Sequence, residues 1–195
     1  MARKNNCGAK QTDIYASLDF CPGETTLPGM RKNVYFTRRA YITKWPKVNK
    51  ATGVFDGDFE LAAEKYWKRI QVVVNSSKFT AASQGTYPNK TFRQHLEMMH
   101  PVLDGVYAAF QTSANNDDLI YLVQESSGHF KALGCEQYPT DTSFSDDSGQ
   151  NATDAVGSTI TAECDAPHTL LIYTGKIMLS ADEDAQEDID DEQTT

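Results

Sequence analysis

The segment that most constrains the fold is Leu119-Ile120-Tyr121-Leu122-Val123, a run of apolar residues with the length of one strand. The turn-forming cluster Asn115-Asn116-Asp117-Asp118 precedes it, and Ser126-Ser127-Gly128 follows it. A continuous apolar run bounded by turn residues is typical of a strand that is buried on both faces. We therefore expect a buried strand at 119–123 and a short hairpin loop at 126–128 that leads to a partner strand at 129–133.

Other segments rich in β-branched and aromatic residues predict further strands, seven or eight in all. They lie at 33–37, 40–43, 66–74, 158–163 and 168–179. Between 89 and 112, Phe92, Leu96 and Met99 recur at helical spacing, and Pro101 suits the first turn of a second helix. Residues 139–157 have loop composition. The expected fold is mainly β, sandwich- or barrel-like, with one flanking helical element, and α+β by content.

The stretch from Val54 to Leu61 alternates acidic and apolar side chains. In a strand, successive side chains point to opposite faces, so Asp56, Asp58 and Glu60 are expected on one face and the phenylalanines on the other. The sequence therefore predicts one strand with an acidic, wet face and a core face.

The 195 residues suffice for one domain with a full core and are too few for two. We expect an N-terminal arm at 1–30, a β-rich domain at 31–180 and an acidic tail at 181–195. The net charge of -9 is uneven, because 182–192 holds eight acidic residues and no basic one. By contrast, 25–55 holds no acidic residue and contains Arg31, Lys32, Arg38, Arg39, Lys44, Lys47 and Lys50.

This basic stretch admits three interpretations. Its interleaved aromatic residues resemble a groove for single-stranded nucleic acid, while a solvated strand face is the more common meaning of such lysines and arginines. The charge distribution favours a third, in which the basic stretch of one subunit contacts an acidic surface, such as the tail, of another. The residues expected at this contact are Arg31, Lys32, Arg38, Arg39, Lys44 and Lys47.

Motifs of reactive chemistry are missing from the sequence. It contains no nucleophile elbow, P-loop, dinucleotide fingerprint or His-Glu-x-x-His, and its four histidines are isolated. Asp117-Asp118 and Asp146-Asp147 lack the ligand spacing of a calcium loop. We expect no catalytic residue, no metal and no cofactor, and we expect the four scattered cysteines to be reduced and mostly buried.

Neither a membrane-spanning run nor the apolar core of a signal peptide is found, so we expect a soluble chain without membrane partners.

The order of these elements resembles that of the major tail-tube proteins of long-tailed, siphovirus-type bacteriophages, with the closest similarity to phages and prophages of Bacteroidota. The resemblance covers about 30–177 and rests on five features. They are the arm ending in Pro28-Gly29-Met30, the segment 56–63, Tyr66-Trp67, the segment Pro88-Asn89-Lys90-Thr91-Phe92 and the run 115–124.

The resemblance implies a structural virion protein, found in the host cytoplasm during assembly and in the tail afterwards. Six copies form a ring whose inward strands make a continuous barrel, and stacked rings conduct DNA during ejection. The expected partners are further copies, the tail terminator, tape measure and baseplate proteins, and DNA in transit. An acidic lumen keeps DNA from sticking, and Asp56, Asp58 and Glu60 are the candidate lumen residues.

Two alternatives remain open. The chain is a head-tail connector, tail terminator or capsid decoration protein of the same virion, or it is a monomeric β-sandwich binding module with 139–157 as its ligand loop. An enzyme is the weakest alternative, because a fold can host chemistry but the sequence offers no site.

Overall fold

The computed structural model describes residues 27–151, 153–181 and 185, which form mainly β structure with 47% strand and 10% helix. The expected fold class is thus confirmed. The arm before Leu27, with Cys7 and Cys21, and most of the acidic tail lie outside the described residues. None of the described helices is long and apolar enough to cross a membrane.

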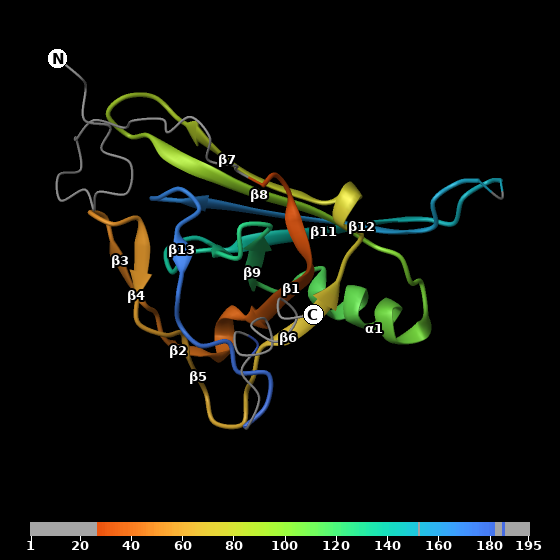
Figure 1. Cartoon of the computed structure of the whole chain (residues 1–195), viewed down its shortest axis with the longest axis horizontal. Coiled ribbons are helices and arrows are strands. Elements are labelled where there is room, and N and C mark those ends of the chain that lie inside the picture. The colour runs from red at the N-terminus through yellow and green to blue at the C-terminus, as the bar shows by residue number, and fades with distance from the viewer. Residues whose placement is uncertain (1–26, 152, 182–184, 186–195) are drawn as a thin grey trace, which may run out of the picture.

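Two antiparallel-rich sheets face each other (Figure 1). The larger has seven strands in the order β3-β4-β13-β10-β9-β1-β6, and the smaller has four in the order β11-β12-β8-β7. The seven strands are β3 (Lys47–Asn49), β4 (Val54–Asp56), β13 (Ile172–Tyr173), β10 (Phe130–Leu133), β9 (Leu119–Glu125), β1 (Met30–Arg38) and β6 (Lys68–Gln71). The four strands are β11 (Thr140–Asp147), β12 (Gly157–Ala166), β8 (Thr91–His100) and β7 (Lys78–Gln84). A separate two-stranded sheet pairs β2 (Ile42–Lys44) with β5 (Glu60–Leu61).

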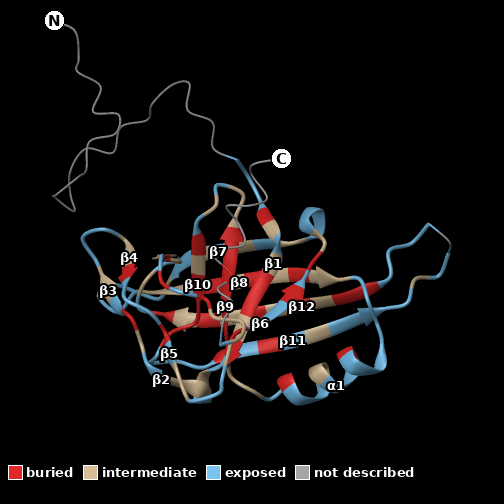
Figure 2. Ribbon diagram, turned by 60° about the horizontal axis from the view of Figure 1, so that its bottom comes forward, coloured by how far each residue is buried: buried red, intermediate tan, exposed pale blue. Residues whose placement is uncertain are grey.

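The core has two parts, one on each face of the seven-stranded sheet (Figure 2). Between the sheets, Leu96 and Ile160 from the smaller one pack with Tyr121 and Val123 from β9. On the far face, Ile120 and Leu122 of β9 join an aromatic cluster that includes Phe59, Trp67 and Tyr173. β9 is therefore buried on both faces, as its apolar run predicts, and its hairpin partner β10 is also confirmed.

The helical region expected at 89–112 is mostly wrong. Residues 91–100 form β8, in which Gln94, Leu96 and Met98 face the core in strict alternation. Apolar side chains on both faces of this strand happen to have helical spacing. In addition, the residue before a proline disfavours the helical conformation, and His100 precedes Pro101. The one α-helix among the described residues, α1 (Gly105–Ala114), starts after Asp104, whose side chain accepts a hydrogen bond of 2.7 Å from Tyr107 N. Pro101 precedes this cap.

The loop expected at 139–157 is also wrong, because its first half forms β11, paired with β12 from Thr140 to Asp147. Thr140 and Thr142 are buried although they are polar, and the serines and aspartates alternate toward solvent. Residues 140–147 therefore form a strand although their composition is typical of a loop. Only 148–156 connects the two strands, and this hairpin end projects from the body (Figure 1).

Two other expected strands are shorter than predicted. Within 66–74 only β6 is a strand, followed by a 3-10 turn, η2 (Val74–Ser76), and within 168–179 only β13 is one. The expected strand at 40–43 is divided between a second 3-10 turn, η1 (Arg39–Tyr41), and β2. Parts of these segments pack in the aromatic cluster through Trp67, Tyr173 and Ile177, whereas η1 and η2 contain no buried residue.

Candidate functional site

The four-stranded sheet ends in two open strands. β11 and β7 lie at its two edges, and neither has a second ladder partner among the described residues. The strands are long, with ten residues each in β8 and β12, eight in β11 and seven in β7. An edge strand presents unpaired N–H and C=O groups to which another chain can add. This sheet therefore offers two places for strand pairing between molecules.

The face of this sheet that points away from the core is polar. Its side chains come from alternate positions: Lys78, Thr80 and Ala82; Arg93, His95, Glu97 and Met99; Thr159, Thr161, Glu163 and Asp165; and Asp141, Ser143, Ser145 and Asp147. Five carboxylates stand against two basic side chains, so the face has a net negative charge. These side chains include no Phe, Tyr or Trp.

Ion pairs link three strands across this face. Lys78 Nζ lies 2.9 Å from Glu97 Oε2, and Arg93 Nε lies 3.0 Å from Asp165 Oδ1. The hydrogen bond from Lys78 lowers the pKa of the Glu97 carboxyl, and the hydrogen bond from Arg93 lowers the pKa of Asp165. Between them, His95 Nδ1 lies 2.9 Å from Glu163 Oε1. Most charged side chains of β7, β8 and β12 on this face are therefore paired with an opposite charge.

The remaining carboxylates of this face are on β11. Asp141 and Asp147 engage no ion pair among the described residues, and both are exposed. Uncompensated negative charge thus lies along one edge of the sheet.

The acidic stretch at 54–61 is not one strand. Gly57, with φ of +93°, separates β4 from β5, and these two strands belong to different sheets. Asp56 accepts a 3.0 Å hydrogen bond from Asn49, Asp58 accepts one of 2.9 Å from the backbone N of Lys176, and Glu60 forms an ion pair with Lys44. All three carboxylates are exposed and Phe55 and Phe59 are buried, but the single acidic strand face was a wrong expectation.

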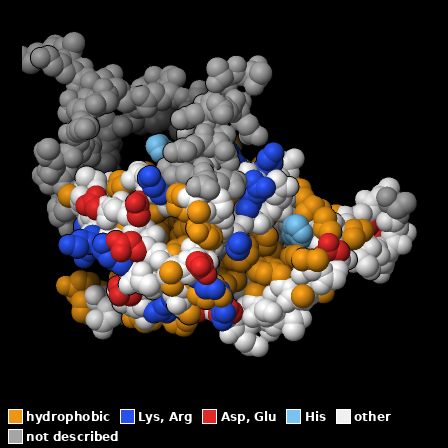
Figure 3. All heavy atoms as spheres, turned by 90° about the horizontal axis from the view of Figure 1, so that it is seen from below, with side chains coloured by type: hydrophobic (Ala, Val, Ile, Leu, Met, Phe, Trp, Pro, Cys, Tyr) orange, Lys and Arg blue, Asp and Glu red, His pale blue; other side chains and the backbone are white. Residues whose placement is uncertain are grey.

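Half of the basic residues expected at subunit contacts have partners within the chain. Arg38 pairs with Asp117, Arg39 Nη1 lies 2.9 Å from Asp118 Oδ2, and Lys44 pairs with Glu60. In the part of the chain that the structure describes, no ion pair engages Arg31, Lys32 or Lys47. On the face shown in Figure 3, basic and acidic side chains are interspersed instead of forming one basic patch.

Asp117 and Asp118 have structural roles, because both form ion pairs within the chain. Besides binding Arg39, Asp118 accepts a 2.8 Å hydrogen bond from Thr140 N, so it ties the end of β1 to the start of β11. Among the residues that the structure places, no group of three or more His, Cys, Asp or Glu is arranged to hold a metal.

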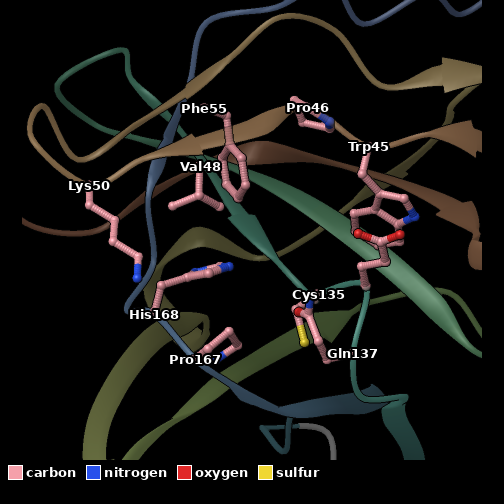
Figure 4. A pocket seen from close by; sticks show the side chains of 11 residues that line it. Trp45, Pro46, Val48, Lys50, Phe55, Cys135, Gln137, Pro167 and His168 are labelled. Carbon is pink, nitrogen blue, oxygen red and sulfur yellow. The ribbon is translucent and has the colours of Figure 1, made fainter.

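A cavity of about 230 Å³ lies beside the edge strand β3. Trp45, Val48 and Phe55 line one side, and Pro167, His168 and Cys135 line the other (Figure 4). Lys50 reaches toward His168 at the rim. The lining is mostly apolar, which suits a small hydrophobic group.

Sequence reasoning missed the polar sheet face, although the signal was present. Thr159, Thr161 and Glu163 alternate with Ile160, Ala162 and Cys164, which is the period of a half-buried strand. The sequence predicts a strand here, but it does not show that 91–100 and 140–147 lie beside it, because their patterns favour a helix and a loop.

Comparisons with models of protein families, with curated proteins and with solved structures found no match for this chain.

Proposed function

We propose that this chain is a structural subunit that assembles with copies of itself, as the tail-tube subunit of a long-tailed bacteriophage. The observation that carries the proposal is the four-stranded sheet, with two open edge strands and one polar, acidic face. The order of the elements, which resembles that of tail-tube proteins, is the reason for proposing this particular family.

Strand direction supports a closed ring. The four strands alternate in direction, so β7 and β11 run antiparallel to each other. Copies related by rotation about an axis along the strands can therefore join β7 of one to β11 of the next without breaking the antiparallel alternation. Closure of the sheet leaves no strand edge exposed. We propose that such rings are hexameric and that they stack.

The polar sheet face is the better candidate for the lumen wall. A continuous wall needs a surface that repeats across subunits, which a four-stranded sheet joined through its two edge strands would supply and the divided segment at 54–61 would not. Excess carboxylates oppose the approach of phosphates, and DNA binding is driven by charge of the opposite sign. The lumen role of Asp56, Asp58 and Glu60 remains a prediction.

Two further features suit contacts between copies. The helix α1 contains no charged residue, and Val106 on its outer side is 80% exposed, next to Val102 at 47% and Leu103 at 40%. Apolar side chains gathered at one exposed place are typical of an interaction surface. The hairpin end between β11 and β12 projects from the body (Figure 2), which suits a contact with a neighbouring copy.

Sedimentation velocity and negative-stain electron microscopy of the purified full chain test the proposal. We expect species that grow with protein concentration, ending in tubes. Isolated rings or trimers indicate a connector, terminator or decoration protein instead. A protein that stays strictly monomeric at high concentration, at the ionic strength and pH of a virion, rules out self-assembly as its role.

A pair of proline substitutions tests the β7 edge. Neighbouring residues of a strand point their N–H groups in opposite directions. One of the two variants, Thr80→Pro or Ala81→Pro, therefore removes a hydrogen bond to β8, and the other removes only an N–H group that points out of the sheet. The outward variant should unfold like the wild type and fail to assemble. Assembly of that variant at the wild-type rate excludes strand pairing at this edge.

The second candidate function is a monomeric binding module, which the cavity beside β3 favours. It requires a stable monomer that binds small apolar ligands there. Loss of such binding in Trp45→Ala, combined with a monomeric wild type, would favour it over the tube.

A further inference from the structure

Two buried thiols from the two sheets lie side by side. Cys135 belongs to the turn that follows β10, and Cys164 points into the core from β12; each is 2% exposed. Their sulfur atoms are 3.8 Å apart, and both cysteines are free. Rotation about the two Cα–Cβ bonds can bring sulfur atoms this close to bonding distance. The pair is therefore positioned to form a disulfide within one chain.

The turn that carries Cys135 is held in place by the core. Gly134 has a φ of +117° and donates a 2.9 Å hydrogen bond to Gln94 Oε1 on β8. A Cβ atom at Gly134 would lie 2.5 Å from Ile120 Cδ1, so only glycine fits without displacement. The approach of the two thiols thus follows from a fixed backbone, not from a flexible loop.

The environments of the two sulfurs differ. A hydrogen bond from Cys164, helped by the backbone N–H groups of Tyr138 and Gln137, lowers the pKa of the Cys135 thiol. The same hydrogen bond and burial raise the pKa of the Cys164 thiol. The guanidinium of Arg39, which donates to Glu136 O in the same turn, adds positive charge near Cys135. One sulfur is therefore suited to attack and the other to donate a proton.

Access is also unequal. Cys135 lines the cavity beside β3, whereas Cys164 does not belong to its lining. The cavity, at about 230 Å³, is several times larger than the volume of about 30 Å³ that one water molecule occupies in the liquid. Of the two cysteines, Cys135 is therefore the one that adjoins the cavity, from which a small oxidant would approach.

We propose that Cys135 and Cys164 form a dithiol site that a hydroperoxide in the cavity converts to a disulfide joining the two sheets. The Cys135 thiolate attacks one peroxide oxygen, the O–O bond breaks, and Cys135 becomes a sulfenic acid as hydroxide or alkoxide leaves. The Cys164 sulfur then attacks the Cys135 sulfur, the S–O bond breaks, and the oxygen leaves as water with the Cys164 proton. Two electrons pass from the sulfurs to the peroxide. This site is independent of the proposed assembly.

The sequence permits a direct test. No Lys or Arg occurs between Lys131 and Lys176, so trypsin releases Cys135 and Cys164 on one peptide, 132–176, without Cys7 or Cys21. Reduced full-length protein is treated with hydrogen peroxide near neutral pH, denatured, alkylated with iodoacetamide and digested. The expected peptide 132–176 lacks two hydrogen atoms and carries no alkyl group, whereas the untreated control carries two.

Two variants identify the order of events. Cys164→Ser should stop at a Cys135 sulfenic acid that dimedone traps, and Cys135→Ser should leave Cys164 unoxidised in the folded protein. The wild-type mass measurement stands even if a variant does not fold. A peptide 132–176 that stays doubly alkylated after peroxide, or a disulfide that links either cysteine to Cys7 or Cys21, overturns the proposal.

Discussion

The two sheets differ in what covers them. The seven-stranded sheet is packed on both faces, so β9 has six successive buried residues from Leu119 to Gln124. Among the described residues, the four-stranded sheet is packed on one face only, and β12 alternates between buried and half-buried positions. Both sheets therefore contribute to the core between them, while the four-stranded sheet also has a polar face and two edge strands outside that core.

The largest expected effect is on the free energy of unfolding and concerns core positions in the two sheets. Leu122→Ala and Leu96→Ala each remove a side chain that is 0% exposed. Each should reduce the free energy of unfolding by about 2–5 kcal/mol, because a cavity remains in a packed core. The matched substitution Thr161→Ala, on the wet face, should change it by less than about 0.5 kcal/mol. Urea unfolding with an unchanged m value measures all three, and a large effect at Thr161 would show that the face is covered.

The next effect concerns the joint between the sheets. Asp118→Ala leaves the N–H of Thr140 and the guanidinium of Arg39 without this acceptor, which should cost about 1–3 kcal/mol. Asp118→Asn keeps an oxygen for Thr140 and should cost less. Equal losses in the two variants would show that the charge of Asp118, and not its hydrogen bond to β11, holds the sheets together.

A smaller effect depends on pH. The pKa values of Glu97 and Asp165 are lowered in the folded protein, so their contribution to stability is present at neutral pH and is lost as pH falls through the acid range, below about 4. Their side chains are 37% and 41% exposed, so solvent screening limits the total to about 1 kcal/mol. Thermal unfolding as a function of pH should show this loss in the wild type and a weaker one in Lys78→Met with Arg93→Met.

The smallest effect on folding separates the two candidate lumen faces. Asp141→Lys with Asp147→Lys reverses charge on the sheet, and Asp56→Lys with Glu60→Lys reverses it at the divided segment. At exposed positions, these changes should alter stability by less than about 0.5 kcal/mol per site. The first pair should make assembled tubes retain duplex DNA in a salt-dependent manner, and the second should not. If only tubes of the second double variant retained DNA, Asp56 and Glu60 would be the lumen residues instead.

Much of the fold can be predicted where burial and residue type agree. β9 and its hairpin with β10 follow from one apolar run and one turn, and β1 follows from its β-branched and aromatic residues. Prediction fails where the local signal is ambiguous. In 91–100, apolar side chains on both faces give helical spacing by coincidence, and in 140–147 threonines occupy core positions that composition assigns to loops.

The candidate site was harder to predict because no single segment contains it. Its residues come from four strands that are brought together by pairings more than 70 residues apart, such as Arg93 with Asp165. The alternation of Asp56, Asp58 and Glu60 predicts one strand face, but Gly57 turns the backbone, and the strands on its two sides belong to different sheets. Local alternation identifies a wet face, whereas the neighbours of that face depend on the strand order.

The two open edges are unlike each other, since β7 and β11 differ in length and in side chains. A joint between them is head-to-tail, so every subunit of a ring has the same sense around the axis, and the upper and lower rims of the ring cannot be equivalent. A stack of such rings therefore has a direction. Such a stack would present one chemical surface at its first rim and another at its last. A tail needs two different ends, because one end binds the capsid and the other faces the host cell.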